Sequence, residues 1–263
     1  VFTIGGNATN KSIITVGDSD NSGSSITYSI GLASKNGTIT NIGDINLNGN
    51  LGIGMYANGK GSSSTYDAIN RGHIYLNPLT TGTPVTRQVG MYLENGAIGV
   101  NYGYIGTNGV SYVGNANVKN LVGVAVLGQS TFENYGTVEI DADKSSGIIV
   151  RGNSPTAPAI IKNYGTIKIS GDGSTGVSYT AASAAGQTGT LLAGGNEDSE
   201  INVGVGVVIA SNGAVSYSQE SNGSKSMADI TFETDPATGL MIIKRNGVNI
   251  NATTFTPTVT ASS

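Results

Sequence analysis

Hydrophobic and polar residues alternate in short blocks along this chain, and the blocks follow a recurring Asn-x-Gly tripeptide. The fourth and sixth residues after the Asn are apolar almost throughout, as in Val138 and Ile140 or Ile167 and Ile169, and polar residues lie between them. This period of two predicts strands with one buried face. The tripeptide recurs after 29, 31, 33 and 29 residues, at Asn41, Asn70, Asn101, Asn134 and Asn163.

A second phrase is a Gly followed by apolar residues one and three positions later, as in Gly147-Ile148-Ile149-Val150. Its copies begin at Gly52, Gly90, Gly123, Gly147 and Gly176, and looser copies begin at Gly206 and Gly239. Each unit of about thirty residues therefore holds about three short strands, joined by corners rich in Gly and Asn. No stretch has helical periodicity or a helix cap followed by an amphipathic run.

Strands this short can bury an apolar face if successive units stack in a spiral, which places equivalent positions ~4.8 Å apart. The predicted fold class is all-β, a single right-handed parallel β-helix over residues 1–263 with about seven to nine coils. A β-sandwich or barrel also has many short strands, but it does not need the same residue at the same place in every unit. Residues 1–37 and 181–263 are expected to form degenerate coils, with 251–263 as an edge strand or a tail.

The recurring Asn has a physical role in such a spiral. Asn tolerates the left-handed backbone region at a corner, and its amide can hydrogen-bond to the Asn one coil above and below. The Gly two residues later relieves steric crowding at the corner. If the two best copies are adjacent coils, Glu133 stacks over Lys162 and Glu139 over Lys168, and these exposed pairs help to set the register.

Loop length singles out two coils. Residues 77–88 and 107–120 extend the same corner of successive units, so we expect them to lie side by side, where solenoids often carry function. Nearby tyrosines could stack on sugar rings, and Arg and Asn side chains could hydrogen-bond hydroxyl groups. The alternative is that Tyr at outward strand positions simply favours sheet formation. The candidate ligand-binding residues are Tyr75, Arg87, Tyr102, Tyr104, Tyr112, Asn115 and Asn117.

Composition adds few constraints. The chain has 40 Gly and only 11 % charged residues, yet 38 % hydrophobic residues, which is typical of extracellular repetitive β-proteins rather than of disordered chains. Its charge of −4 is scattered, which argues against nucleic-acid binding. There is no Cys, and no apolar stretch reaches the ~20 residues of a membrane-spanning helix. Without an initiator Met or a signal-peptide pattern, a processed or excised fragment is expected.

Catalytic and metal-binding motifs are sparse. The only histidine, His73, is expected on the surface, and it lacks the partners of a zinc site or a catalytic triad. Two stretches imitate a calcium loop, "DSDNSG" from Asp18 and "DADKSSG" from Asp141, but neither has the Glu that a hand-type loop needs eleven residues later. We therefore expect no cofactor, no metal and no catalytic residue. The acids occur singly, at Asp44, Asp67, Glu94, Glu139, Asp172, Glu200 and elsewhere.

The line "NYGTVEIDADKSSGIIV" followed by "NYGTIKISGDGSTGVSY" resembles the passenger region of type V autotransporters, in particular the large outer-membrane adhesins of fusobacteria. The best copies cover residues 132–179, and looser copies extend from about residue 39 to residue 242. The resemblance implies an exported fibre on the surface of a Gram-negative cell, and we expect the segment to be a monomer. A C-terminal barrel outside this segment would anchor it in the outer membrane, and it would attach to a glycan or protein receptor on host cells or other bacteria.

Three functions remain open on the sequence. An adhesin segment would bind its receptor through the paired loops. A structural spacer would supply only reach and stiffness. A β-helix polysaccharide hydrolase or lyase would need two acids, or an acid and an Arg, within catalytic reach on one face.

Overall fold

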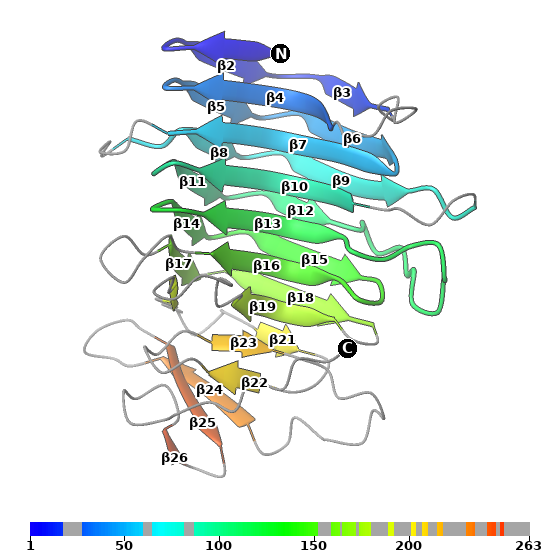
Figure 1. The fold of residues 1–263 in the computed structure, drawn as a ribbon, viewed down its shortest axis with the longest axis vertical. Coiled ribbons are helices and arrows are strands. Elements are labelled where there is room, and N and C mark those ends of the chain that lie inside the picture. Colours follow the sequence, from blue (N-terminus) through cyan, green and yellow to red (C-terminus); the bar gives the residue numbers. More distant parts are fainter. Residues whose placement is uncertain are drawn as a thin grey trace.

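A computed structural model gives the fold, and it is built from strands throughout the part of the chain that it describes (Figure 1). That part contains no helix long and apolar enough to cross a membrane. It comprises residues 1–17, 28–59, 65–81, 87–151, 159–163, 165–171 and 174–179, and the strands 189–191, 201–203, 207–209, 215–217, 230–234, 241–245 and 248–249.

Three parallel sheets of seven strands form the body, and each coil contributes one strand to each sheet in turn. Sheet A consists of β1 (Phe2–Ile4), β4 (Ser29–Lys35), β7 (Leu51–Asn58), β10 (Arg87–Glu94), β13 (Val122–Leu127), β16 (Ser146–Arg151) and β19 (Thr175–Tyr179). Sheet B consists of β2 (Asn7–Asn10), β5 (Thr38–Asn41), β8 (Ala68–Asn70), β11 (Ile98–Asn101), β14 (Thr131–Asn134), β17 (Ala159–Asn163) and β20 (Gly189–Leu191). Sheet C consists of β3 (Ile13–Val16), β6 (Asp44–Gly49), β9 (His73–Pro78), β12 (Tyr104–Gly106), β15 (Thr137–Asp141), β18 (Thr166–Ser170) and β21 (Ile201–Val203).

The predicted register is confirmed. In sheet C, Ile45 pairs with Ile74, Ile74 with Ile105, Ile105 with Val138, and Val138 with Ile167. All five side chains are fully buried, as expected for one apolar column of a parallel β-helix core. The all-β fold and the coil of about thirty residues therefore follow from the repeat.

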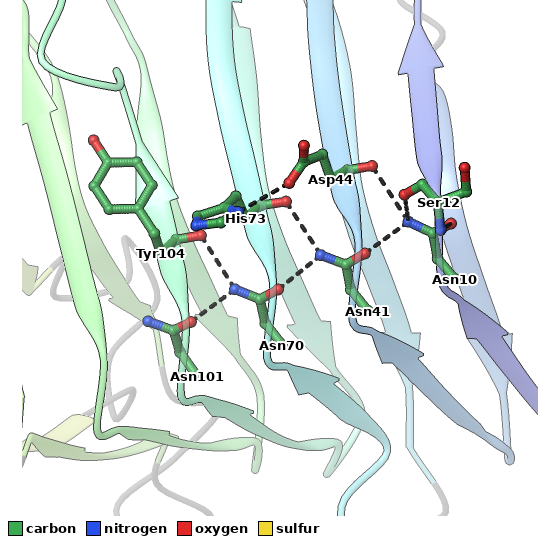
Figure 2. Close-up of polar contacts among 8 residues, drawn as sticks. All are labelled: Asn10, Ser12, Asn41, Asp44, Asn70, His73, Asn101 and Tyr104. Atoms are coloured by element: carbon green, nitrogen blue, oxygen red, sulfur yellow. Dashed lines mark hydrogen bonds and ion pairs between the residues drawn. The ribbon is translucent and has the colours of Figure 1, made fainter.

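The ladder of Asn side chains runs through the buried corner between sheets B and C (Figure 2). Each amide donates from Nδ2 to Oδ1 of the next Asn, at 2.9 Å from Asn41 to Asn70, 2.8 Å from Asn70 to Asn101 and 2.9 Å from Asn101 to Asn134. The main chain pairs Asn134 with Asn163 in the same register, which extends the column.

The ladder begins one coil earlier than the sequence predicted. Asn10 pairs with Asn41 in the sheet, and its Nδ2 lies 2.8 Å from Oδ1 of Asn41. The expected left-handed backbone is wrong, because no ladder Asn is among the residues with positive φ. These Asn residues are needed for their buried amides and not for an unusual φ.

The Gly of the Asn-x-Gly tripeptide, which follows the ladder Asn residues from Asn41 onward, has the steric role expected of it. A Cβ atom on Gly72, Gly103 or Gly136 would lie 2.0 Å from a carbonyl oxygen of the preceding coil. The alignment of the second phrase is wrong in its first copy. In the sheet, Gly90 pairs with Gly54, whereas the sequence predicted that it would pair with Gly52. A Cβ atom on Gly54 would lie 2.6 Å from the carbonyl oxygen of Gly90, whereas the nearest atom to one on Gly52 lies at 3.5 Å.

The parallel pattern changes after β21. Strands β22 (Val207–Ile209) and β23 (Val215–Tyr217) pair antiparallel, as do β24 (Ile230–Thr234), β25 (Met241–Arg245) and β26 (Val248–Asn249). The looser copies of the Gly phrase therefore do not mark further parallel coils, which corrects that expectation. Residues 18–27, with the first calcium-like stretch, and the proposed edge strand or tail at 251–263 lie outside the described residues.

Candidate binding surface

Two neighbouring corner loops connect sheet C to sheet A. The longer one, residues 107–121, folds back onto the body: the Tyr112 amide donates to the Asp141 carbonyl at 2.8 Å, and the Gly114 amide donates to Oδ2 of Asp143 at 2.8 Å. Its side chains Tyr112, Val118 and Leu121 join the hydrophobic core. The loop is therefore anchored from inside and is held in one shape.

The described start of the shorter loop, residues 79–81, lies beside the longer loop as expected, because Nδ2 of Asn117 donates to the Thr80 carbonyl at 3.0 Å. Residues 82–86 of that loop lie outside the described residues. The outer surface of the described loop residues carries three aliphatic side chains that are about half exposed: Leu79 (46 %), Val110 (45 %) and Val113 (49 %). Residues 107–118 contain no charged side chain. Exposed aliphatic groups on a rigid, uncharged support are typical of a protein contact surface.

An aromatic group lies on the outer face of sheet C, beside these loops. The rings of His73 and Tyr75 stack with their centroids 5.3 Å apart and their planes 7° apart. The Tyr104 ring is tilted by 48° to that of Tyr75, with centroids 6.0 Å apart. The pairing of adjacent coils thus brings the Tyr104 ring to the two rings of β9, although Tyr104 is about thirty residues away in the sequence.

Carboxylates hold two of these rings in place. Nδ1 of His73 lies 2.9 Å from Oδ1 of Asp44 in the preceding coil, as Figure 2 shows. The Tyr104 hydroxyl donates to Oε2 of Glu139 at 2.8 Å and accepts from the Asn108 amide at 2.7 Å. Burial and the hydrogen bond to Glu139 raise the pKa of Tyr104 above its ordinary value of 10.0, because both favour the protonated hydroxyl.

A second aromatic group lies at the corner between sheets B and C. Tyr102 stacks on Tyr135 of the next coil, with ring centroids 5.2 Å apart and planes 16° apart. The Arg71 guanidinium of the preceding coil lies 4.6 Å from the Tyr102 centroid. Because these partners come from the coils on opposite sides, both faces of the Tyr102 ring are covered, and this ring is not available for stacking on a sugar.

The structure separates the seven candidate ligand residues. Tyr75 and Tyr104 come together on sheet C, and Asn115 and Asn117 lie in the long loop. Arg87 is exposed at the start of β10 in sheet A. Tyr102 lies between β11 and β12, at the corner between sheets B and C. The expectation that Tyr112 contacts a ligand is wrong, because only 8 % of this residue is exposed and its ring packs in the core. Asn115 uses Oδ1 to accept the Asn117 amide at 3.0 Å, which shapes the loop.

Sequence reasoning missed two features of this side of the molecule. The first is that His73, expected merely on the surface, forms a stacked pair with Tyr75. The second is a short Ser ladder, in which the Ser145 amide donates to Oγ of Ser174 at 2.9 Å and the Leu121 amide to Oγ of Ser145 at 3.1 Å. The matching "SSG" and "STG" letters before Gly147 and Gly176 were the available signal.

The acids of the described parallel coils bond to groups of neighbouring coils, as Asp44 does to His73 and Asp67 to the Ile98 amide. No group of three or more His, Asp or Glu side chains that could hold a metal ion occurs among the residues that the structure describes. In the second calcium-like stretch, Oδ1 of Asp141 accepts the Ser170 hydroxyl at 2.8 Å, and Asp143 accepts the Gly114 amide. Asp172 and Glu200 lie outside the described residues.

Residues 1–104 match the family model of the BigA third pectate lyase-like domain, so the chain is similar to that domain from its first strand to the start of β12. No curated protein and no solved structure matches the chain. The similarity agrees with a parallel β-helix, and it suggests a bacterial surface-exposed protein of the adhesin kind.

Proposed function

We propose that this chain is a non-enzymatic passenger segment of a type V autotransporter adhesin. In this proposal the segment is displayed outside a Gram-negative outer membrane, and a C-terminal barrel beyond the segment anchors it. It attaches as a single chain to a receptor on host cells or other bacteria, and it uses neither a cofactor nor a metal. The similarity to a BigA domain and the exposed aliphatic surface of the paired loops support this function.

The paired loops are the single observation that carries the binding role over a spacer role. A spacer needs only the core columns and the polar ladders. Here two successive coils instead lengthen the same corner, and the bond from Asn117 to Thr80 fastens one loop to the other. The three exposed aliphatic side chains of the loops point to a receptor contact, because exposed apolar groups gain free energy when a partner covers them.

The decisive experiment coats beads with the purified chain and counts their attachment to cultured epithelial cells and to bacteria. The test variant is Val110→Asp combined with Val113→Asp, which places charge on the loop surface and leaves Tyr112 and Val118 in the core. The matched control is Ile42→Asp, since Ile42 is 50 % exposed at the corner between sheets B and C. We expect the double variant to lose about 90 % of attachment, or about tenfold, and the control to keep it.

Each alternative has its own outcome. Attachment by the double variant at the level of the control would reject the loops as the contact surface. Failure of the parent chain to attach to any cell would favour the spacer. The enzyme alternative predicts cleavage of polygalacturonate, seen as new reducing ends for a hydrolase and also as ultraviolet absorbance of an unsaturated product for a lyase. We expect no cleavage, because the described Glu94 and Glu139 carboxylates already bond to tyrosine hydroxyls of neighbouring coils.

A further inference from the structure

We propose that the outer face of sheet C, across β6, β9, β12 and β15, binds a neutral hexose glycan. This inference deepens the proposed function and rests on it, since it names a receptor class for one face of the adhesin. The face, called here the glycan face, consists of Asp44, Asn46, His73, Tyr75, Tyr104 and Glu139.

The aromatic part of the glycan face is pre-organised. Tyr75 stacks on His73, His73 bonds to Asp44, and Tyr104 is fixed by bonds at its hydroxyl to Glu139 and to the Asn108 amide. Tyr75 and Tyr104 are both partly exposed. Rings that are already immobilised lose little conformational entropy when a pyranose packs its apolar C–H groups against them.

The polar part of the glycan face suits hydroxyl groups. In sheet C, Asn46 pairs with Tyr75 across the strands, and two residues earlier, on the same face, Asp44 pairs with His73. Carboxylate oxygens accept hydrogen bonds from sugar hydroxyls, and the Asn amide both donates and accepts. Ring stacking beside such groups gives a sugar both an apolar and a polar contact.

The charge of this face selects between classes of glycan. Asp44, Glu139 and Asp141 all point outward from sheet C, and the cation in register with this group is Lys168, opposite Glu139. A polyuronate would bring one carboxylate per sugar against these three acids, which costs free energy through like-charge repulsion. A neutral hexose chain meets no such penalty.

The test measures binding of the whole purified chain to immobilised glycans by surface plasmon resonance. The probes are hexamers of galactan, glucan and mannan, with oligogalacturonate of the same length as the anionic comparison. We expect at least one neutral hexamer to bind, and oligogalacturonate to bind more than tenfold more weakly. Equal or tighter binding of oligogalacturonate would overturn the inference.

Variants locate the site. Tyr75→Ala should weaken binding of the neutral hexamer about tenfold, the upper end for one aromatic contact, whereas Tyr75→Phe keeps the ring and should bind within about twofold of the parent. The matched control is Tyr135→Ala, which removes a 45 % exposed tyrosine from the corner between sheets B and C, outside the glycan face. Equal losses for Tyr75→Ala and Tyr135→Ala would place the glycan elsewhere.

The two proposals fail separately. If no neutral hexamer binds while the beads still attach to cells through the loops, the glycan face is wrong and the adhesin function stands. If neither hexamers nor cells are bound, both are wrong. Circular dichroism and urea unfolding of each variant confirm that the losses do not come from unfolding.

Discussion

At the scale of single residues, buried Asn amides and closely packed Gly residues hold the coils in register. Each interior Asn of the ladder donates to the next Asn and to a main-chain carbonyl of the next coil, as Nδ2 of Asn70 does to the Tyr104 carbonyl at 3.2 Å. These groups are satisfied only because the neighbouring coil supplies a matching Asn. The neighbouring Gly residues allow the main chains to approach where a Cβ atom would clash.

Asn70→Ala should therefore lower the free energy of unfolding by about 2–4 kcal/mol. It removes the acceptor of one N–H of the Asn41 amide and one of the donors to Oδ1 of Asn101, and both of these groups are buried. Asn77→Ala is the control, because the Asn77 amide bonds to Asn48 at the exposed surface and should cost less than about 0.5 kcal/mol. Urea denaturation gives both values, and equal losses would show that the ladder contributes nothing special.

Gly54→Ala and Gly52→Ala separate the register seen in the structure from that expected from the sequence. Gly54→Ala should destabilise by about 2 kcal/mol or more, because its Cβ would meet the Gly90 carbonyl at 2.6 Å and Cγ2 of Ile74 at 2.7 Å. Gly52→Ala meets only ordinary contacts and should be neutral or slightly stabilising. Thermal unfolding of both variants decides, and the reverse order would restore the register centred on Gly52.

At the scale of strands and loops, Tyr–Glu hydrogen bonds join coils on all three faces. Tyr56 bonds to Glu94 on sheet A, Tyr66 to Glu133 beside sheet B at 2.7 Å, and Tyr104 to Glu139 on sheet C. The sequence predicted that Glu133 pairs with Lys162 and Glu139 with Lys168, and the main-chain register does place the members of each pair side by side. The Lys162 side chain lies outside the described residues. Both carboxylates accept hydrogen bonds from tyrosines of earlier coils, and the repeat does not predict these bonds because the tyrosines do not recur at equivalent positions.

These tyrosines make stability sensitive to high pH. The pKa of Tyr104 in the fold is raised above its ordinary value of 10.0, by burial first and by Glu139 second. The contribution of Tyr104 is therefore fully present below about pH 10 and is lost as the pH rises toward the raised pKa. Between about pH 8 and pH 11, the urea midpoint of the parent should fall more than that of Tyr104→Phe. A parallel fall of both would contradict this reading of the bond to Glu139.

Loop 107–121 should depend on its buried anchor and not on its exposed tip. Tyr112→Ala removes a ring from the core and should cost about 3 kcal/mol. Val110→Ala changes a side chain that is 45 % exposed and should cost less than about 0.5 kcal/mol. Urea unfolding of the two variants checks this difference. A Tyr112→Ala variant as stable as the parent would return Tyr112 to the candidate ligand residues.

At the scale of the whole molecule, the repeat of about thirty residues was enough to predict the fold. Apolar columns such as Ile45, Ile74 and Ile105 must recur in every coil, so the sequence displays them. Contacts made once do not recur: Tyr102 is covered because Arg71 and Tyr135 happen to flank it, and Tyr112 turns inward inside a loop without a repeat. The glycan face could be predicted only in part for the same reason. The positions of Tyr75 and Tyr104 follow from the strand pattern, but the stacking of His73 on Tyr75 depends on side-chain rotamers.

The antiparallel strands after β21 could not be read from the Gly phrase. A Gly followed by two alternating apolar residues fits any strand with one buried face, whether its neighbour runs parallel or antiparallel. Only the Asn-x-Gly corner was specific to the coil, and its last copy is at Asn163.

The central claim is that residues about thirty apart in sequence lie in columns, and engineered cysteines test it directly because the chain has none. Thr137 and Thr166 pair across β15 and β18 with side chains on the outer face, so Thr137→Cys with Thr166→Cys should form an intramolecular disulfide on mild oxidation. Thr137→Cys with Ser170→Cys separates the thiols by roughly 13 Å along the strand and should remain reduced. Peptide mapping by mass spectrometry reports both, and a disulfide in neither pair, or equally in both, would contradict the stacked coil.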